Sequence, residues 1–210
     1  MAKMSSTAPR AADRILETAT SLFYREGSRA VGVDEIVAGA GATKPTLYRA
    51  FGSKDQLIAA YLEGEAARFW SLLDTAVAGH PGDARAQLLA CFDALETLSQ
   101  QKGFRGCALS NAAVEYPDPT HIGRAVAVTH KTKLRKRLRE LTREMDARKP
   151  KKLADSLLLL IEGAFVTSQI FGADGPAGVA RGAAQALIAA HTRKADEPDK
   201  DAPDQDSRKG

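Results

Sequence analysis

Apolar residues recur at helical spacing along almost the whole chain, and no segment of the 210 residues offers convincing alternation of apolar and polar positions. Ile15, Ala19, Leu22 and Phe23 illustrate the pattern, because they share one helix face and the stripe closes at Gly27. Aromatic residues make up only 6%, so a core must be built mainly from aliphatic side chains, which favours helices. The sequence therefore predicts an all-α protein.

Breaks in the helical pattern predict a small N-terminal bundle and a larger C-terminal one. A short second helix is expected over about residues 33–40, a third opening at Thr43, and a fourth running from Ser53 to about Gly79. Ser53 is a good N-cap, and Asp55 lies in the first turn, where the helix dipole favours an acid. Later helices are expected over about residues 84–101, 120–148, 152–171 and 177–192, and a shorter helix is expected to end at Tyr116. Pro150 is expected to stop the helix over 120–148.

Charge and hydropathy limit the class of protein. The net charge of +4 permits a nucleic-acid partner without demonstrating one. The longest aliphatic run, residues 157–161, is far shorter than a membrane span, and the N-terminus has no apolar region like that of a signal peptide. We therefore expect a cytoplasmic protein without membrane association, in which Cys91 and Cys107 are free thiols. The four histidines lack metal-ligand spacing, so no metal or cofactor is expected.

Two short helices joined by a tight glycine turn, behind a longer first helix, form the helix-turn-helix arrangement. The second helix of this motif enters the DNA major groove with its N-terminal residues nearest the bases. Helical geometry places Leu47, Ala50 and Phe51 toward the core, and Pro45 lies in the first turn, where its missing N–H is tolerated. The predicted DNA-binding residues are Arg14, Thr43, Lys44, Pro45, Thr46, Tyr48, Arg49 and Lys54.

These polar side chains suit DNA chemistry. Lys44 and Arg49 can reach phosphates or guanine edges, Thr46 a base or a thymine methyl, and the Tyr48 hydroxyl a phosphate oxygen. Lys54 begins the next helix, where its ammonium and the helix N-terminus together favour an anion. For any one of these residues a solvated helix face is an equally good explanation, but it explains the whole set poorly.

Residues 10–62 resemble the DNA-binding domain of the TetR family of bacterial transcriptional regulators. The resemblance rests on the pattern Ile15-x-x-x-Ala19-x-x-Leu22-Phe23-x-x-x-Gly27 and on the run DEIVAGAGATKPTLYRAFGSKDQL over residues 34–57. It implies a homodimeric repressor, without enzymatic activity, that binds double-stranded, palindromic operator DNA and is released by a small-molecule inducer bound in a helical C-terminal domain. One departure is that Val31 and Gly32 stand where the family usually has hydroxyl residues that cap the second helix and touch a phosphate.

The expected division is a helix-turn-helix domain over residues 10–55, a sensing and dimerisation domain over 56–193, and an acidic, disordered tail over 194–210. The fourth helix, from about residue 53, links the first two. Residues 195–210 carry six acids and three bases with no apolar periodicity. The stretch 131–152 carries eleven bases and three acids, and a solvated face is favoured there over a second nucleic-acid surface.

In the C-terminal domain, Cys107, Asn111 and Glu115 fall along one helix face, with Cys107 in the first turn beside Arg105. Cys107 is either a thiol that senses oxidants or electrophiles or a small apolar residue packed after a glycine, and the sequence leaves both open. The proposed ligand-binding residues are Phe69, Trp70, Leu73, Phe92, Phe104, Cys107, Asn111, Phe165 and Gln169.

The resemblance also points to the last two long helices as a dimer interface, through Leu157, Leu160, Ile161, Ala164, Ala180, Ala183, Ala184 and Leu187. Two other functions remain as alternatives to a ligand-responsive repressor. A non-specific DNA-binding protein would usually carry more charge than residues 1–62, which hold eight bases and six acids. A helical-bundle enzyme would need converging catalytic or metal-binding side chains, and none stands out.

Overall fold

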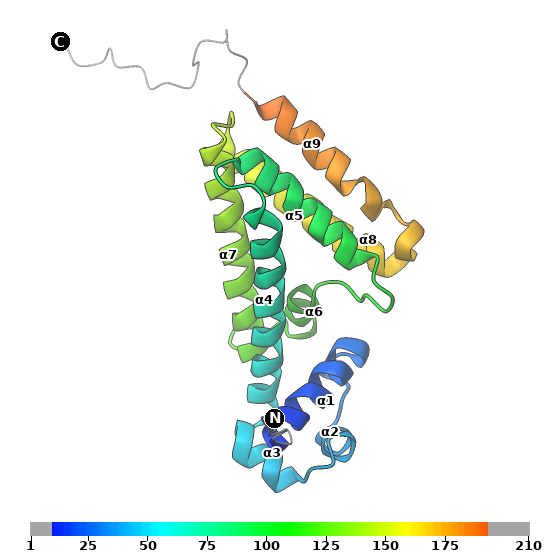
Figure 1. Cartoon of the computed structure of the whole chain (residues 1–210). Coiled ribbons are helices and arrows are strands. Elements are labelled where there is room, and N and C mark those ends of the chain that lie inside the picture. The colour runs from blue at the N-terminus through cyan, green and yellow to red at the C-terminus, as the bar shows by residue number, and fades with distance from the viewer. Residues whose placement is uncertain (1–9, 193–210) are drawn as a thin grey trace, which may run out of the picture.

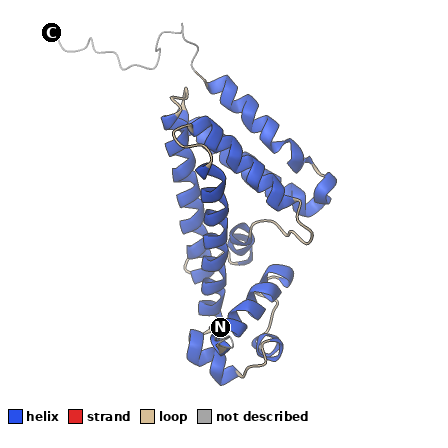
Figure 2. Ribbon diagram, in the orientation of Figure 1, coloured by secondary structure: helices blue, strands red, loops and turns tan. Residues whose placement is uncertain are grey.

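The computed structural model describes residues 10–192, which form α-helices and two short 3-10 turns without any strand in that range (Figure 2). This confirms the predicted all-α fold. The predicted acidic tail, residues 194–210, lies outside the described residues.

Three helices make a small unit at one end of the molecule: α1 (Ala11–Glu26), α2 (Val33–Gly39) and α3 (Lys44–Phe51) (Figure 1). Their buried side chains Ile15, Phe23, Ile36 and Leu47 are at most 2% exposed. Each buried aliphatic or aromatic side chain of this size contributes about 1.5–3 kcal/mol. These side chains hold the three helices together and continue into one hydrophobic core shared with the rest of the described chain.

One detail of this unit differs from expectation, and a second shows what becomes of the departure from the family pattern. Ala50 is exposed instead of facing the core. It lies about 60° around α3 from Leu47, at the edge of the buried stripe, where a methyl group is too short to be covered. Val31, which replaces a usual hydroxyl residue, is 1% exposed and packs in the core, while Gly32 caps α2 without a side-chain hydrogen bond.

The larger unit is built on two long neighbouring helices, α4 (Lys54–Ala78) and α7 (Ile122–Glu144) (Figure 1). The predicted cap of α4 is confirmed, because Ser53 accepts a hydrogen bond from the Gln56 backbone N–H at 3.1 Å. Around this pair lie α5 (Ala84–Ser99), α6 (Ala108–Glu115), α8 (Pro150–Phe171), the 3-10 turns η1 (Gly172–Asp174) and η2 (Pro176–Val179), and α9 (Ala180–His191).

The turn between α7 and α8 corrects one predicted boundary. The helix expected to reach residue 148 ends at Glu144, and Pro150 opens α8 instead of stopping the preceding helix. Asp146 and Lys149 adopt left-handed backbone conformations, with φ of 51° and 52°, and this reverses the chain. Proline suits the first turn of α8 because its missing N–H has no helical partner there.

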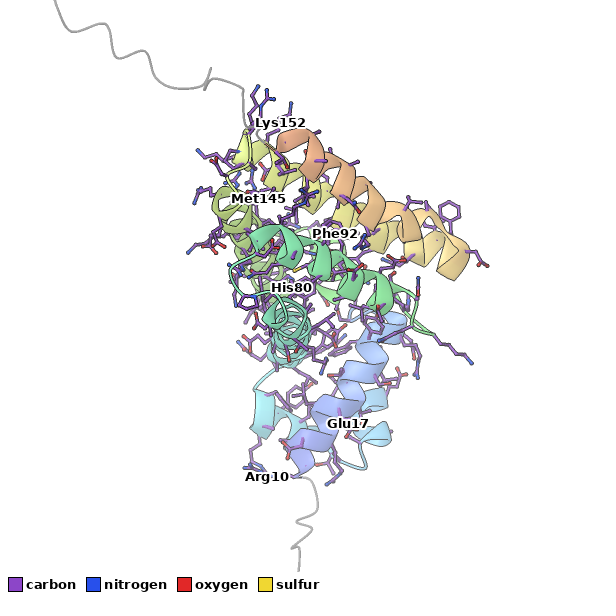
Figure 3. The ribbon with its side chains drawn as sticks, turned by 45° about the horizontal axis from the view of Figure 1, so that its top comes forward. Arg10, Glu17, His80, Phe92, Met145 and Lys152 are labelled. Carbon is purple, nitrogen blue, oxygen red and sulfur yellow. The ribbon has the colours of Figure 1, made fainter. Side chains whose placement is uncertain are left out.

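Part of the basic stretch 131–152 faces α8. Arg135 and Arg139 pair with Asp155 at 2.7 and 3.0 Å, and Lys131 pairs with Glu162 at 2.5 Å. Hydrogen bonds from Arg135 and then Arg139 hold the pKa of Asp155 well below its usual range. Figure 3 shows Met145 and Lys152 at the opposite end of the molecule from Arg10 and Glu17 of α1. Lys131, Arg135 and Arg139 therefore join α7 to α8 through ion pairs.

Helix α8 is long and apolar enough to cross a membrane by length and composition, with a mean hydropathy of 1.4 over its most apolar stretch. A core helix of a soluble protein passes the same test, so this is weak evidence for a span. One face of α8, including Leu153, Leu157 and Phe165, packs in the core of the chain. The opposite face leaves Leu159 and Ile170 exposed.

Candidate functional site

The outer surface of α3 carries most of the predicted DNA-binding side chains. Lys44, Pro45 and Arg49 are exposed, and Tyr48 is 46% exposed although it is aromatic. A large exposed aromatic side chain among cations is unusual for a solvated helix face and suits contact with a phosphate backbone. The sequence placed these residues together, and the structure presents them on one open surface.

Two threonines build the start of α3. Thr43 is the N-cap, and its hydroxyl accepts a hydrogen bond from the Thr46 backbone N–H at 3.4 Å. The two hydroxyls are also 2.9 Å apart, so they hydrogen-bond to each other. Thr43 therefore fixes the helix terminus and holds the half-buried Thr46 hydroxyl in place.

An acid of α2 pairs with the first residue of α3. Lys44 Nζ lies 2.7 Å from Asp34 Oδ1, and both side chains are at least half exposed. The hydrogen bond to Asp34, together with its charge, raises the pKa of Lys44. Asp34 therefore partly neutralises the charge of Lys44, which lies at the N-terminal end of α3, where this helix is expected to approach the DNA bases.

The remaining two predicted DNA-binding residues hold backbone in place. Arg14 of α1 donates from Nε to the Ala40 carbonyl at 3.1 Å and from its terminal nitrogen to the Gly41 carbonyl at 3.4 Å. Lys54 donates to the Arg29 carbonyl at 3.4 Å, and burial lowers its pKa. Arg14 thus fixes the turn before α3, and Lys54 ties the start of α4 to the α1–α2 loop.

A second set of contacts joins the N-terminal unit to the end of α6. The Glu115 carboxylate accepts hydrogen bonds from Ser28 Oγ at 2.8 Å and from the Arg29 backbone N–H at 3.1 Å. The Arg29 guanidinium donates to the Glu115 carbonyl at 3.1 Å, and the Ser28 and Tyr116 hydroxyls are 2.9 Å apart. No local sequence signal connects Ser28 with Glu115, so sequence reasoning missed this contact.

A central cavity of about 370 Å³ lies between α1, α4, α5, α6, α8 and the loop before α6. Phe69, Phe104, Cys107 and Phe165, four of the proposed ligand-binding residues, line it. Phe104 and Phe165 also contact each other, with ring centroids 5.7 Å apart. The cavity wall is largely apolar and aromatic, with a few polar side chains, as is typical of small-molecule sites.

Tyr24 lines the same cavity, although it belongs to α1. Its hydroxyl donates to the Gly106 carbonyl at 3.2 Å and accepts from the Arg105 backbone N–H at 2.8 Å. Burial raises the pKa of Tyr24, so the hydroxyl keeps its proton and both hydrogen bonds at neutral pH. Sequence reasoning missed Tyr24, because its distance from the cavity-lining loop along the chain gives no local signal.

The other proposed ligand-binding residues lie elsewhere. Trp70 lines a groove between α4 and α7, and Asn111 and Gln169 line a hollow between α1, α6 and α8. Leu73 and Phe92 are buried core side chains that line none of these three hollows.

Cys107 caps α6, is 8% exposed and faces the central cavity. The cation beside it is Lys131 of α7, whose Nζ donates to Cys107 Sγ at 3.3 Å and pairs with Glu162. Ser110 Oγ donates to the same Glu162 carboxylate at 2.7 Å. Cys91, in contrast, is packed in the core, and burial raises its thiol pKa to about 11, which disfavours the reactive thiolate.

Within residues 10–192, no three His, Cys, Asp or Glu side chains lie close enough together to hold a metal ion.

Comparison with known proteins agrees with this geometry. Residues 15–61 match the profile described as "Bacterial regulatory proteins, tetR family". A TetR-family transcriptional regulator from Streptomyces coelicolor is 31% identical, with a TM-score of 0.83 over 87% of this chain and 96% of that one. This chain belongs to the TetR family. TetR-family proteins are DNA-binding transcriptional regulators that typically act as dimers, and they are not enzymes.

Other relatives support the same assignment. A putative TetR transcriptional regulator from Streptomyces avermitilis is 30% identical, with a TM-score of 0.76 over 87% of this chain and 98% of that one. An uncharacterized HTH-type transcriptional regulator from Mycobacterium tuberculosis is 43% identical over 58 residues, which are 28% of this chain and 29% of that relative. The match to that curated relative therefore covers less than a third of its length.

Proposed function

We propose that this TetR-family protein is a homodimeric repressor that binds a palindromic operator and is released by a small molecule in the central cavity or by modification of Cys107. The observation that carries the proposal is the position of Tyr24. This one side chain belongs to the DNA-binding unit, lines the cavity, and hydrogen-bonds to the loop that leads into Cys107.

The proposed DNA contact uses α3 as the recognition helix. Lys44, Thr46 and Arg49 would contact base edges or nearby phosphates, and Tyr48 a phosphate. Lys54 at the start of α4 would bind a phosphate together with the helix N-terminus. Two such units in a dimer bind half-sites about 34 Å apart, one turn of DNA, or a multiple of that distance.

The proposed release acts through the contact between Tyr24 and the Arg105–Gly106 backbone. A molecule that fills this cavity would lie against the residues that line it, which include Tyr24, Phe104 and Phe165. If such a ligand binds a conformation with Tyr24 and α1 shifted more tightly than the DNA-binding conformation, it raises the population of the shifted conformation and lowers that of the DNA-binding one. The aromatic wall favours an apolar ligand, and Glu65, Arg68 and Gln101 at the same cavity offer hydrogen bonds.

The proposed dimer interface lies on the outer faces of α8 and α9. Leu159 is 73% exposed and Ile170 66% exposed, and Val166 lies between them on the same face of α8. Gly182, Ala186 and Ala189 form an exposed small-residue face on α9. An apolar stripe of this length on a surface helix is typical of a protein interface.

The dimer-interface residues proposed from the sequence lie beneath this exposed stripe or at its edges. Leu157, Ile161 and Ala184 are buried inside the chain itself, at most 2% exposed, so they hold α8 and α9 in the fold. The half-buried residues of the set lie at the edges of the exposed stripe: Leu160, Ala164, Ala180, Ala183 and Leu187.

We place the division between the two proposed domains at residues 55 and 56, in the first turn of α4.

Fluorescence anisotropy tests the operator. The protein is titrated onto duplex from its own upstream intergenic region and onto random duplex at the same salt concentration. We expect tight binding to the first only, with Tyr48→Ala abolishing it and Lys136→Ala on α7 leaving it unchanged. Equal and weak binding to both duplexes would instead support a non-specific DNA-binding protein.

The thiol route is tested on the same complex with N-ethylmaleimide. We expect release of wild type and of Cys91→Ser, but not of Cys107→Ser. Release of all three, or of none, would contradict a role for Cys107, and a screen of apolar small molecules on Cys107→Ser then tests the cavity alone.

A further inference from the structure

Tyr61 of α4 is a buried side chain whose hydroxyl has no hydrogen-bond partner among residues 10–192. The side chain is 4% exposed, and its ring packs against Phe23 with the centroids 5.6 Å apart. Unlike the ring nitrogens of His130, the hydroxyl oxygen keeps some accessible surface. Burial raises the pKa of Tyr61, so the hydroxyl keeps its proton at neutral pH. Most buried hydroxyls are satisfied, so this one calls for a partner from outside the chain.

Tyr61 lines a hollow of about 350 Å³ where the N-terminal unit meets the C-terminal helices. It lines neither the central cavity nor the groove between α4 and α7. Phe23 of α1 and Ala112 of α6 are buried beside Tyr61 in this hollow, and Val114 at its edge is 82% exposed. We call this space the junction hollow. Its volume is in the range of small-molecule sites, and its wall combines apolar with polar side chains.

One end of the junction hollow is positive. The Arg105 side chain lines it, and its guanidinium makes no ion pair or hydrogen bond with residues 10–192. Gln169 reaches the same end from α8, because a Cβ on Gly106 would collide with its side-chain amide. That amide also has no hydrogen-bond partner among the described residues. A guanidinium beside a free amide N–H suits a carboxylate.

The other end of the junction hollow is negative. Asn111 lies at the positive end, since it donates to the Arg105 carbonyl at 2.8 Å, and Glu115 follows about 6 Å further along α6. The two donors from the N-terminal unit bind only Oε2 of Glu115, and Oε1 has no hydrogen-bond partner among residues 10–192. The charge of Glu115 acts on the Tyr61 hydroxyl, which places this hydroxyl on the negative side of the hollow.

We propose that the junction hollow binds a small unbranched molecule with a carboxylate at one end and an ammonium group at the other. The carboxylate pairs with Arg105 and accepts a hydrogen bond from the Gln169 amide. The ammonium donates to Glu115 Oε1 and to the Tyr61 hydroxyl oxygen, and the hydrocarbon chain between the ends lies along Val114. Both ends then make charge-assisted hydrogen bonds, and the buried hydroxyl gains its partner.

The junction hollow is separate from the central cavity. Tyr24 and Ala108 line both and so stand between them, with the Tyr24 hydroxyl bound to the loop before α6. None of the groups assigned to the proposed ligand lines the central cavity. The proposal therefore goes beyond the release mechanism above and does not depend on whether an inducer binds in the central cavity.

Equilibrium dialysis of the full-length chain with 6-aminohexanoate tests the site. Hexanoate, which lacks the ammonium group, and hexylamine, which lacks the carboxylate, are the controls of the same chain length. We expect saturable binding of 6-aminohexanoate and at least tenfold weaker binding of each control. Non-saturable binding of 6-aminohexanoate, or equal binding of the three compounds, would overturn the proposal.

Two variants assign the two ends, and neither removes a hydrogen bond of the fold. Arg105→Gln is expected to weaken 6-aminohexanoate binding about tenfold and to leave hexylamine binding unchanged. Tyr61→Phe removes only the hydroxyl and is expected to weaken 6-aminohexanoate binding several-fold and to leave hexanoate binding unchanged. Lys102→Gln, at an exposed lysine of the central cavity, is the control and should bind as wild type does. Unchanged affinity in Arg105→Gln or Tyr61→Phe, or a loss in Lys102→Gln, would overturn the site.

Discussion

At the scale of single residues, Glu115 connects two parts of the molecule that are far apart in the sequence. Its carboxylate accepts hydrogen bonds from Ser28 and Arg29, 87 and 86 residues away. Hydrogen bonds to a charged group are stronger than neutral ones, and an acceptor lost from a partly buried site leaves its donors unsatisfied. Glu115 is therefore a residue on which the packing of α6 against the N-terminal unit depends.

We predict that Glu115→Ala lowers the free energy of unfolding by about 1–3 kcal/mol, because Ser28 and Arg29 lose their acceptor. Glu115→Gln should lose less, since the amide keeps one acceptor oxygen. Urea unfolding followed by circular dichroism measures both. Glu17→Ala, an exposed acid on α1 visible in Figure 3, is the control and should have little effect. Equal stability of Glu115→Ala and wild type would show that the contact contributes nothing.

His130 makes stability depend on pH. Burial, followed by the charges of Lys131 and Lys133, lowers its pKa from 6.5 to about 4, and Glu162 opposes this shift. Between these two pH values the unfolded chain binds a proton that the folded chain does not. The folded state therefore loses stability as the pH falls through this window, and the contribution is fully present above it.

We predict that the difference in free energy of unfolding between pH 7 and pH 5 is smaller in His130→Leu than in wild type. Urea unfolding at the two pH values measures it. The strongly shifted Asp155 titrates below this window and does not interfere. His80→Leu, at an exposed histidine after α4, should retain the wild-type difference (Figure 3). An identical pH dependence of His130→Leu and wild type would contradict the account.

At the scale of elements, α2 and α3 share the proposed DNA-contacting surface. Arg14 fixes the turn between them, and Thr43 caps α3, so the helix is presented on a rigid support. The Asp34–Lys44 pair spans the two helices at the surface. An exposed ion pair of this kind contributes little to stability, but its acid repels a phosphate backbone.

We predict that Asp34→Asn tightens DNA binding several-fold at low salt, because it removes a negative charge and leaves Lys44 available to DNA. The gain should shrink as salt rises, since screening weakens both effects. Anisotropy titrations at two salt concentrations measure it, with Asp74→Asn, at an exposed acid on α4, as the control. Weaker binding by Asp34→Asn would mean that the ion pair holds Lys44 in its DNA-contacting position.

At the scale of the whole molecule, α8 has two apolar faces. One face packs on the chain's own core through Leu153 and Leu157, and the other exposes Leu159 and Ile170. An exposed apolar patch on a helix surface commonly marks a site that a partner covers. In the proposed dimer, a second copy of the chain packed through α8 and α9 would cover the outer face and would place two α3 helices on one DNA duplex.

We predict that Leu159→Glu converts a dimer into a monomer and weakens operator binding more than tenfold, because a carboxylate in the apolar interface stays unpaired. Sedimentation velocity measures the mass and anisotropy the affinity. Val128→Glu, at a 53% exposed apolar residue on α7, is the matched control and should remain dimeric. A dimeric Leu159→Glu would place the interface elsewhere.

The local part of this structure could be predicted from the sequence. Helix periodicity, the Ser53 cap, the glycine turn and the exposed polar face of α3 all depend on residues within a few positions of one another. The boundary near Pro150 was less predictable, because proline suits the first turn of a helix as well as the end of one. Among the proposed ligand residues, periodicity identified apolar positions but could not separate those in the core from those at a cavity.

The sequence by itself therefore determined the all-α class, the helix-turn-helix and the family, because propensity, capping and motif spacing are local. Only the tertiary structure decided which residues meet across the molecule. Cys107 meets Lys131 over 24 residues, and Tyr24 meets Gly106 over 82. It also decided that the His130 ring nitrogens are buried without a hydrogen-bond partner among residues 10–192 and that α8 keeps an apolar face exposed in this range. These properties follow from how the helices pack, and packing depends on all the contacting side chains at once.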